Sequence, residues 1–234
     1  MISVEEIKKE KLRTGFTTGT SATAAAKAGL LSIINQTKIE SVDVKLPKGS
    51  FIKIPIQQCK FDKNKSTCSV IKDGGDDPDV THGAEIIVEI SLTEKLNEIE
   101  IDGGEGVGIV TKPGLGLELN KAAINPVPKK MIKENLKEIL DKHLLKNGIK
   151  VIISVPKGKE LGPKTDNPRI GILNGISILG TSGIVIPFST ASYAASIRQN
   201  LDVAIAMGND TVVLTTGGRS EDFAKKILDL PDHC

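Results

Sequence analysis

Aromatic residues are scarce in this chain of 234 residues, which has no tryptophan, one tyrosine and 3% aromatic residues overall. The core must therefore be built from Ile, Val, Leu and Ala, and few side chains remain that could stack on the bases of a single-stranded nucleic acid. The formal net charge of +2 is also too balanced for a dedicated binder of nucleic acid or of an anionic membrane surface. We expect neither kind of partner.

Cysteine, histidine and long apolar runs are also sparse. The three cysteines show no C-x-x-C spacing, and the three histidines are scattered at His82, His143 and His233, so we expect no protein-bound metal. The most apolar stretch, residues 175–188, is too short to span a bilayer. Residues 1–11 are charged and polar rather than a signal peptide. These features predict a cytoplasmic protein.

Two of the cysteines, Cys59 and Cys68, fall on segments that are typical of strands, 51–61 and 66–72. A two-residue loop at 63–64 would place them directly opposite each other, close enough to form a disulfide. In a reducing cytosol we expect two small buried thiols instead.

The first two thirds of the chain predict an α+β domain with a mostly antiparallel sheet. The hydroxyls of residues 17–21 are a strong helix-start signal, and an alanine-rich helix slim enough to pack closely on a sheet follows them. Segments 41–46 and 51–56 form a hairpin pattern. Further strands are expected at 66–72, 85–92 and 97–101, and a helix at 129–145 that ends before Asn147 and Gly148.

The remaining residues predict a Rossmann-like α/β domain, with the boundary near residues 147–150. The apolar run 151–155 is typical of a strand buried on both faces of a parallel sheet. Helices are expected at 189–199 and 221–228, and short buried strands at 203–206 and 212–214. The predicted domains are therefore residues 1–147 and 148–234.

Five stretches are too rich in Gly, Thr, Asp and Asn to be simple connectors: 13–20, 72–83, 102–108, 167–183 and 215–221. The first and last open helices, where free N–H groups favour anions, although a well-capped helix with nothing bound is the alternative. The second carries four aspartates that could bind a hard cation, ribose hydroxyls or a cationic group, or form a solvated acidic turn. The third and fourth match neither the dinucleotide nor the P-loop pattern.

Arginine is also rare, because most of the basic residues are lysines. Of the four arginines, Arg13, Arg169 and Arg219 lie in or beside Gly- and Thr-rich segments. Arginine suits bidentate contact with carboxylate or phosphate. The alternative is that these are surface residues beside loops.

Taken in order along the chain, these blocks resemble those of the CbiD family. The resemblance rests on LRTGFTTGT (12–20), the acidic segment 73–83, GGEGVG (103–108), TKPGL (111–115), AINPVP (123–128), GISILGTSG (175–183) and TTGGRS (215–220). Ser21 stands where the family usually has a small residue or Cys. Family members continue well beyond the last block, so this chain is either a short member of the family or truncated at the C-terminal end of its second domain.

Membership of this family implies S-adenosylmethionine-dependent methylation of C-1 of cobalt-precorrin-5B, which gives cobalt-precorrin-6A. The cobalt would then enter with the corrinoid substrate and not as a metal of the protein. A sulfonium methyl is already activated, so the enzyme mainly has to align donor and acceptor and exclude water. This explains why the sequence shows no catalytic triad.

Candidate residues for this reaction follow from their chemistry. The carboxylates of the corrinoid suit arginines and free N–H groups, which favours Arg13, Thr17, Thr18, Gly19, Thr20, Arg169 and Arg219. For the methyl donor the candidates are Gly103, Gly104, Gly175, Gly180, Thr181, Ser182, Gly183, Thr215, Thr216, Gly217 and Gly218. The carboxylate of Asp102 or Glu105 could hold the ribose hydroxyls of the donor or stabilise its positive sulfonium during catalysis.

Two other functions remain open from the sequence. A nucleotide- or phosphate-using enzyme would use the Thr-Gly loops for anions and bind ATP with magnesium. A corrinoid carrier without catalysis would bind the macrocycle and not S-adenosylmethionine. A homo-oligomer is compatible with each of these functions.

Overall fold

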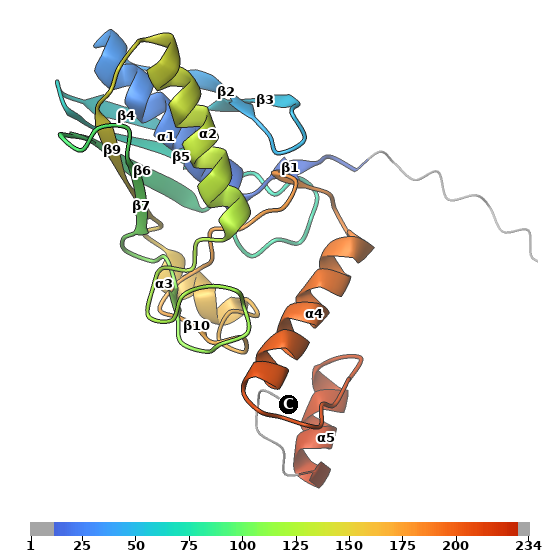
Figure 1. The fold of residues 1–234 in the computed structure, drawn as a ribbon. Coiled ribbons are helices and arrows are strands. Elements are labelled where there is room, and N and C mark those ends of the chain that lie inside the picture. The colour runs from blue at the N-terminus through green and yellow to red at the C-terminus, as the bar shows by residue number, and fades with distance from the viewer. Residues whose placement is uncertain (1–11, 229–234) are drawn as a thin grey trace, which may run out of the picture.

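The computed structural model describes residues 12–228 and places a five-stranded sheet at the centre of the fold (Figure 1). Its strands are β4 (Gln58–Phe61), β5 (Lys65–Ile71), β6 (Glu85–Thr93), β9 (Gly148–Ser154) and β7 (Ile99–Gly103), in that spatial order. All neighbours are antiparallel except β7 and β9. The mixed α+β architecture expected from the sequence is therefore confirmed.

Helix α1 (Thr18–Asn35) lies directly on the sheet, with α2 (Pro126–Lys142) beside it on the same side (Figure 1). Its five alanines between 22 and 28 are fully buried, and a Cβ added at Gly29 would lie 2.9 Å from Ile90 Cγ1 of β6. A slim helix face is what permits this close packing. The predicted hairpin is confirmed as β2 (Ser41–Lys45) and β3 (Phe51–Pro55).

The buried side chain of Asn135 ties α2 to this hairpin. Its amide nitrogen donates to the carbonyl of Lys45 at 3.0 Å, and its amide oxygen accepts from the N–H of Lys45 at 3.0 Å. The helix predicted at 129–145 is confirmed, although it runs from Pro126 to Lys142 and so begins and ends earlier than predicted. The fixed φ of Pro126 suits a first helical position.

The long loops of the chain leave the sheet at one edge. Ile71 at the end of β5 pairs with Glu85 at the start of β6, and Ser154 and Gly103 end the neighbouring strands β9 and β7 at the same level. These loops contain the short strands β8 (Ile109–Val110), β10 (Ile172–Leu173) and β11 (Ile184–Val185). Strand β11 pairs with β1 (Gly15–Phe16), which directly precedes α1. All the chemically interesting blocks up to residue 188 therefore gather at this edge.

The strand-rich second domain expected from the sequence is not confirmed. Residues 203–206 are not a strand but the last turn of α4 (Thr190–Ala206), and residues 212–214 form neither strand nor helix. Short apolar runs do not distinguish a strand from a helix. In α4 only Val203 and Ala204 are buried, and Val203 packs in a cluster with Ile170, Ile172 and Val110.

The helices predicted in this part are confirmed as α4 and α5 (Gly218–Leu228). A short helix α3 (Gly158–Leu161) and a 3-10 turn (Gly162–Lys164) precede them. Figure 1 shows α4 and α5 extending away from the sheet. Of the described helices, none has both the length and the apolar character needed to cross a membrane.

Strand β9 corrects the expectation of a parallel sheet buried on both faces. It lies between β6 and β7, antiparallel to the first, and its side chains alternate, with Val151 and Ile153 buried, Lys150 exposed and Ile152 half-buried. A Rossmann-like arrangement is not confirmed, because α1 and α2 both lie on one face of the five-stranded mixed sheet (Figure 1). Strand β9 begins at Gly148 and pairs with β6 and β7, which belong to the predicted first domain. These pairings do not support a domain boundary near residues 147–150, which stays a prediction.

The register predicted for the two cysteines is confirmed. Cys59 and Cys68 are direct partners on β4 and β5, and their sulfurs lie 3.0 Å apart as free thiols. Cys68 is fully buried and Cys59 half-buried, and burial raises the pKa of the Cys68 thiol. The polar segment 1–11 and His233, which entered the expectations above, lie outside the described residues.

The close approach of α1 to the sheet is testable at Gly29. We expect Gly29→Ala to lower the free energy of unfolding by about 1–3 kcal/mol, because the new methyl overpacks Ser66 and Ile90. Gly217→Ala is the control, since a Cβ there meets nothing within 4 Å. Urea denaturation of both variants measures this, and equal stabilities would contradict the packing described.

Candidate functional site

The N-terminus of α1 is buried beneath the segment 177–183. Thr18 Oγ1 donates to the carbonyl of Ser177 at 3.1 Å and accepts from the N–H of Leu179 at 2.9 Å. The N–H of Gly19 donates to the carbonyl of Leu179 at 3.0 Å, and Thr20 Oγ1 donates to that of Gly183 at 2.7 Å. Thr17 caps the helix, as its sequence predicts, by accepting from the N–H of Thr20 at 3.2 Å. We call this set of contacts the threonine junction.

The threonine junction brings together two blocks that the sequence assigned to different ligands. Thr17, Thr18, Gly19 and Thr20 were expected to hold the corrinoid, yet their hydroxyls and N–H groups face the protein and the three threonines are buried. Gly180 was expected at the donor, and a Cβ there would lie 2.4 Å from Thr17 Oγ1. A well-capped helix describes this geometry, and the ligand roles of these residues stay predictions.

The other candidates in this segment are also used in packing. A Cβ on Gly175 would lie 2.3 Å from the carbonyl oxygen of Gly106, and one on Gly183 would meet Leu46 and Thr20. Ser182 Oγ donates to the carbonyl of Ile184 at 3.0 Å, whereas Thr181 is exposed. The glycines here permit close contact between segments of the chain.

The threonine junction is testable by Thr18→Val, which keeps the shape of the side chain and removes its hydroxyl. The N–H of Leu179 loses its acceptor, so we expect a loss of about 1–3 kcal/mol in the free energy of unfolding. Thr190→Val, at an exposed position of α4, is the matched control and should change stability by less than about 0.5 kcal/mol. Thermal and urea denaturation would contradict the assignment if both variants matched the unaltered chain.

Arg13 and the acidic loop 73–83 dock onto each other beside β1. The Arg13 guanidinium forms a close ion pair with Asp73, and its Nε lies 3.9 Å from Asp76 Oδ1. The backbone N–H of Arg13 donates to Asp76 Oδ2 at 2.6 Å. The hydrogen bond from Arg13 lowers the pKa of Asp73. Gly15 and Gly75 allow the two backbones to touch, because a Cβ at Gly75 would lie 2.2 Å from the carbonyl oxygen of Arg13.

The remaining aspartates of the loop also have protein partners. Asp77 Oδ1 accepts from the N–H of Phe188 at 2.9 Å, and Asp79 Oδ2 lies 2.5 Å from the ammonium of Lys72, a side chain only 2% exposed. Of the alternatives for the four aspartates, contact with cationic groups therefore describes this loop. The cations are Arg13 and Lys72 of the protein itself. Within residues 12–228 no group of three or more His, Cys, Asp or Glu side chains is placed to hold a metal ion.

The buried pair of Lys72 and Asp79 makes a prediction that depends on pH. We expect Lys72→Met to lower the free energy of unfolding at pH 7 by about 3 kcal/mol, since it leaves a largely buried carboxylate without its partner. Burial raises the pKa of Asp79, but the charge of Lys72 and hydrogen bonds from Lys72 and Thr81 outweigh it, so the pKa is lowered overall.

A carboxyl whose folded pKa is depressed adds stability above its unfolded pKa of about 3.9, and this stability is lost as pH falls through the folded pKa. The difference between Lys72→Met and the unaltered chain should therefore shrink in acid. The control is Lys130→Met, which removes only an exposed pair with Glu134 and should cost less than about 0.5 kcal/mol. Urea denaturation at neutral and acid pH measures both, and a difference independent of pH would contradict the pairing.

The glycines of block 103–108 bring three loops into contact. A Cβ on Gly103 would lie 2.6 Å from Ala122 Cβ, one on Gly104 would lie 2.4 Å from Ser154 Oγ, and one on Gly106, where φ is +71°, would lie 1.9 Å from the carbonyl oxygen of Val155. Gly103 and Gly104 thus pack against the chain, and their predicted contact with the donor stays a prediction. Glu105 is exposed.

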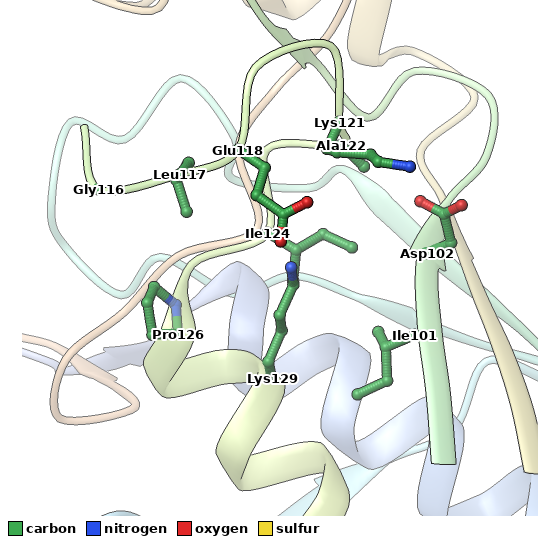
Figure 2. Close-up of a pocket in the computed structure, with 10 residues that line it drawn as sticks. All are labelled: Ile101, Asp102, Gly116, Leu117, Glu118, Lys121, Ala122, Ile124, Pro126 and Lys129. Atoms are coloured by element: carbon green, nitrogen blue, oxygen red, sulfur yellow. The ribbon is translucent and has the colours of Figure 1, made fainter. Parts of the chain in front are cut away.

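Asp102, at the end of β7, lines a pocket of about 400 Å³ between that strand, the loop 116–122 and the start of α2 (Figure 2). The lining residues are Ile101, Asp102, Gly116, Leu117, Glu118, Lys121, Ala122, Ile124, Pro126 and Lys129. Ala122 and Ile124 form a buried apolar floor. The sequence pointed to Asp102 and missed Glu118, Lys121 and Lys129, because single charged residues in a lysine-rich chain carry no signal.

The fifth block lies apart from this pocket. Ser220 Oγ accepts from the N–H groups of Thr216 and Gly217, each at 3.2 Å, and so holds the turn that precedes α5. Gly217, Gly218 and Arg219 are exposed, and a Cβ on either glycine would meet nothing within 4 Å. Arg169 forms an ion pair with Glu221 of α5 at 2.5 Å. Figure 1 shows α5 far from β1, so Arg13 and Arg219 are not brought together.

The fold defines a class of mixed α+β protein with a pocket at one edge of its sheet. The CbiD family model matches residues 5–187. A cobalt-precorrin-5B C(1)-methyltransferase from Priestia megaterium is 50% identical over 98% of this chain and 63% of its own length, and one from Geobacillus kaustophilus is 52% identical over 92% and 58%. The chain belongs to the CbiD family.

A solved structure supports the same assignment. The 1.9 Å crystal structure titled cobalamin biosynthesis protein (cbiD), from Archaeoglobus fulgidus, is 31% identical and superposes with a TM-score of 0.57, covering 93% of this chain and 68% of that one. The chain spans about six tenths of the length of the curated relatives it matches.

Proposed function

We propose that this chain transfers a methyl group from S-adenosylmethionine to C-1 of cobalt-precorrin-5B, giving cobalt-precorrin-6A. The observation that carries the proposal is the identity of 47–52% to relatives named cobalt-precorrin-5B C(1)-methyltransferase, which extends over at least 92% of the chain. The pocket at the sheet edge supports it, since a volume of about 400 Å³ lies in the range of small-molecule sites.

The proposed step needs alignment more than acid–base chemistry. An electron pair of the acceptor carbon takes the methyl group, and the electron pair of the breaking bond stays on sulfur, so the sulfonium becomes the neutral thioether S-adenosylhomocysteine. Holding donor and acceptor in line provides most of the rate increase. A carboxylate such as Asp102 beside the sulfonium is proposed to orient the positive donor electrostatically.

For the acceptor, we propose cationic contacts from Arg219 and from the other two arginines. Arg219 is exposed, and Arg13 and Arg169 have partly exposed side chains even though each is paired with a carboxylate. The corrinoid carries many carboxylates that would exchange for Asp73 or Glu221 as partners. Thr215 and Thr216, which were expected at the donor, lie beside Arg219 in sequence, and their role stays a prediction.

The two alternatives differ in what they bind. A carrier would bind the corrinoid without S-adenosylmethionine, and a nucleotide-using enzyme would bind magnesium-ATP. We also propose that the protein is cytoplasmic and forms a homo-oligomer. The reason for the homo-oligomer is that large apolar side chains are exposed on α4 and α5, and contact between copies would bury them. These include Tyr193, Ile205, Phe223 and Ile227.

The experiment is an anaerobic turnover with cobalt-precorrin-5B and S-adenosylmethionine labelled in its methyl group. We expect the corrinoid to gain one labelled methyl and S-adenosylhomocysteine to accumulate in equal amount, as measured by mass spectrometry. Calorimetric titration with magnesium-ATP is the control and should show no binding. Corrinoid binding without methyl transfer would overturn the proposal in favour of the carrier, and binding of ATP alone would favour the nucleotide enzyme.

A further inference from the structure

The pocket beside β7 presents charged groups of both signs over an apolar floor. Asp102 ends β7, Glu118 and Lys121 come from the loop that follows β8, and Lys129 lies in the first turn of α2. Figure 2 shows the Lys121 side chain extending toward the side of Asp102, and Lys129 rising from the helix toward Ile124 and Glu118. Ile101 and Leu117 line opposite sides of the floor.

None of these four charges is used in an ion pair with a described residue. The lysine ion pairs among residues 12–228 involve Lys72, Lys95, Lys130 and Lys225, and not Lys121 or Lys129. Asp102 accepts a hydrogen bond only from the neighbouring N–H of Gly103, at 2.8 Å, and Glu118 has no side-chain partner in the same range. This differs from the acidic loop, where every aspartate has a protein partner.

The position of the pocket is fixed by the packing already described. The floor residue Ile124 bridges Ile178, and the N–H of Asn125 donates to the carbonyl of Ile178 at 2.9 Å. Residues 177–179 are held in turn by Thr18 in the threonine junction. The pocket therefore lies one backbone segment away from the start of α1, and residues 177–179 tie its floor to that helix.

We propose that this pocket binds the amino-acid end of the methyl donor, with Lys121 and Lys129 on its carboxylate, Glu118 on its ammonium and Asp102 beside the sulfonium. The assignment rests on the proposed function. The donor carries a carboxylate, an ammonium and a sulfonium. The two lysines match the negative carboxylate, and the two carboxylates of the pocket match the two positive groups. These four charges do not match the corrinoid or ATP, whose many negative groups Asp102 and Glu118 would repel.

The test compares ligands with and without the amino-acid end. The probes are S-adenosylhomocysteine and 5′-methylthioadenosine, titrated calorimetrically into the unaltered chain, Lys121→Gln, Lys129→Gln and the control Lys133→Gln, which lies on α2 outside the lining. We expect each pocket variant to weaken S-adenosylhomocysteine about 10- to 100-fold, as for the loss of a hydrogen bond to a charged group, and to leave 5′-methylthioadenosine unchanged. The control should bind both ligands normally.

The role of Asp102 has a separate signature. Because it faces the sulfonium, Asp102→Asn should weaken S-adenosylmethionine more than the neutral thioether S-adenosylhomocysteine. Circular dichroism checks that each variant is folded. Equal losses for both ligands, or loss of 5′-methylthioadenosine binding in the lysine variants, would overturn the assignment.

The outcomes separate the pocket from the function. If the unaltered chain methylates cobalt-precorrin-5B, and Lys121→Gln and Lys129→Gln bind S-adenosylhomocysteine as tightly as it does, the pocket assignment is overturned. The proposed function then stays intact. Absence of both turnover and S-adenosylhomocysteine binding in the unaltered chain would overturn both. Selective loss of S-adenosylhomocysteine in the pocket variants, with turnover in the unaltered chain, would establish both.

Discussion

The threonine junction is the constraint on which the rest of the sheet edge depends. The start of α1 has N–H groups that the helix itself cannot satisfy. The hydroxyl of Thr17 accepts from the N–H of Thr20, and the carbonyl of Leu179 accepts from the N–H of Gly19. Thr18 is both donor and acceptor for the same segment. Because these groups are buried, an unmade bond would cost more than the bond itself contributes, so segments 17–20 and 177–183 are held in one register.

This register decides where the free charges lie. Gly15 and Gly19 allow backbones to approach each other closely, and Gly180 leaves room for the side chain of Thr17. The acidic loop then docks on Arg13 and Lys72. Charges at the edge of the sheet are thereby neutralised within the protein on the side of β1. On the side of β7, the charges of the pocket form no ion pair with a described residue. Pairing within the protein therefore distinguishes the structural charges beside β1 from the candidate ligand-binding charges beside β7.

The sequence predicted the local structure of this chain better than its topology. The start of α1, the hairpin of β2 and β3 and the pairing of Cys59 with Cys68 follow from caps, alternation and turn length, which act between residues near in sequence. Strand β9 was predicted as a strand, yet its insertion between β6 and β7 depends on contacts across more than fifty residues. Val203 was assigned to a strand because apolar character alone does not separate a strand from a helix end.

The candidate site shows the same division. Asp102 was identified because it follows a strand and opens a glycine-rich turn, and it does line the pocket. The threonines of residues 17–20 looked like ligand groups because a capped helix start and an anion site use the same residue types, and only tertiary contacts show that their bonds are made within the protein. Glu118, Lys121 and Lys129 converge from a loop and a helix, which no spacing in the sequence records.

A crystal structure of the chain with S-adenosylhomocysteine bound would show directly which charges hold the methyl donor. We expect the ligand between β7, the loop 116–122 and α2, with its carboxylate against Lys121 and Lys129, while the threonine junction keeps its hydrogen bonds. A ligand bound instead to the hydroxyls of Thr17–Thr20, or to the turn at 215–218, would contradict this expectation.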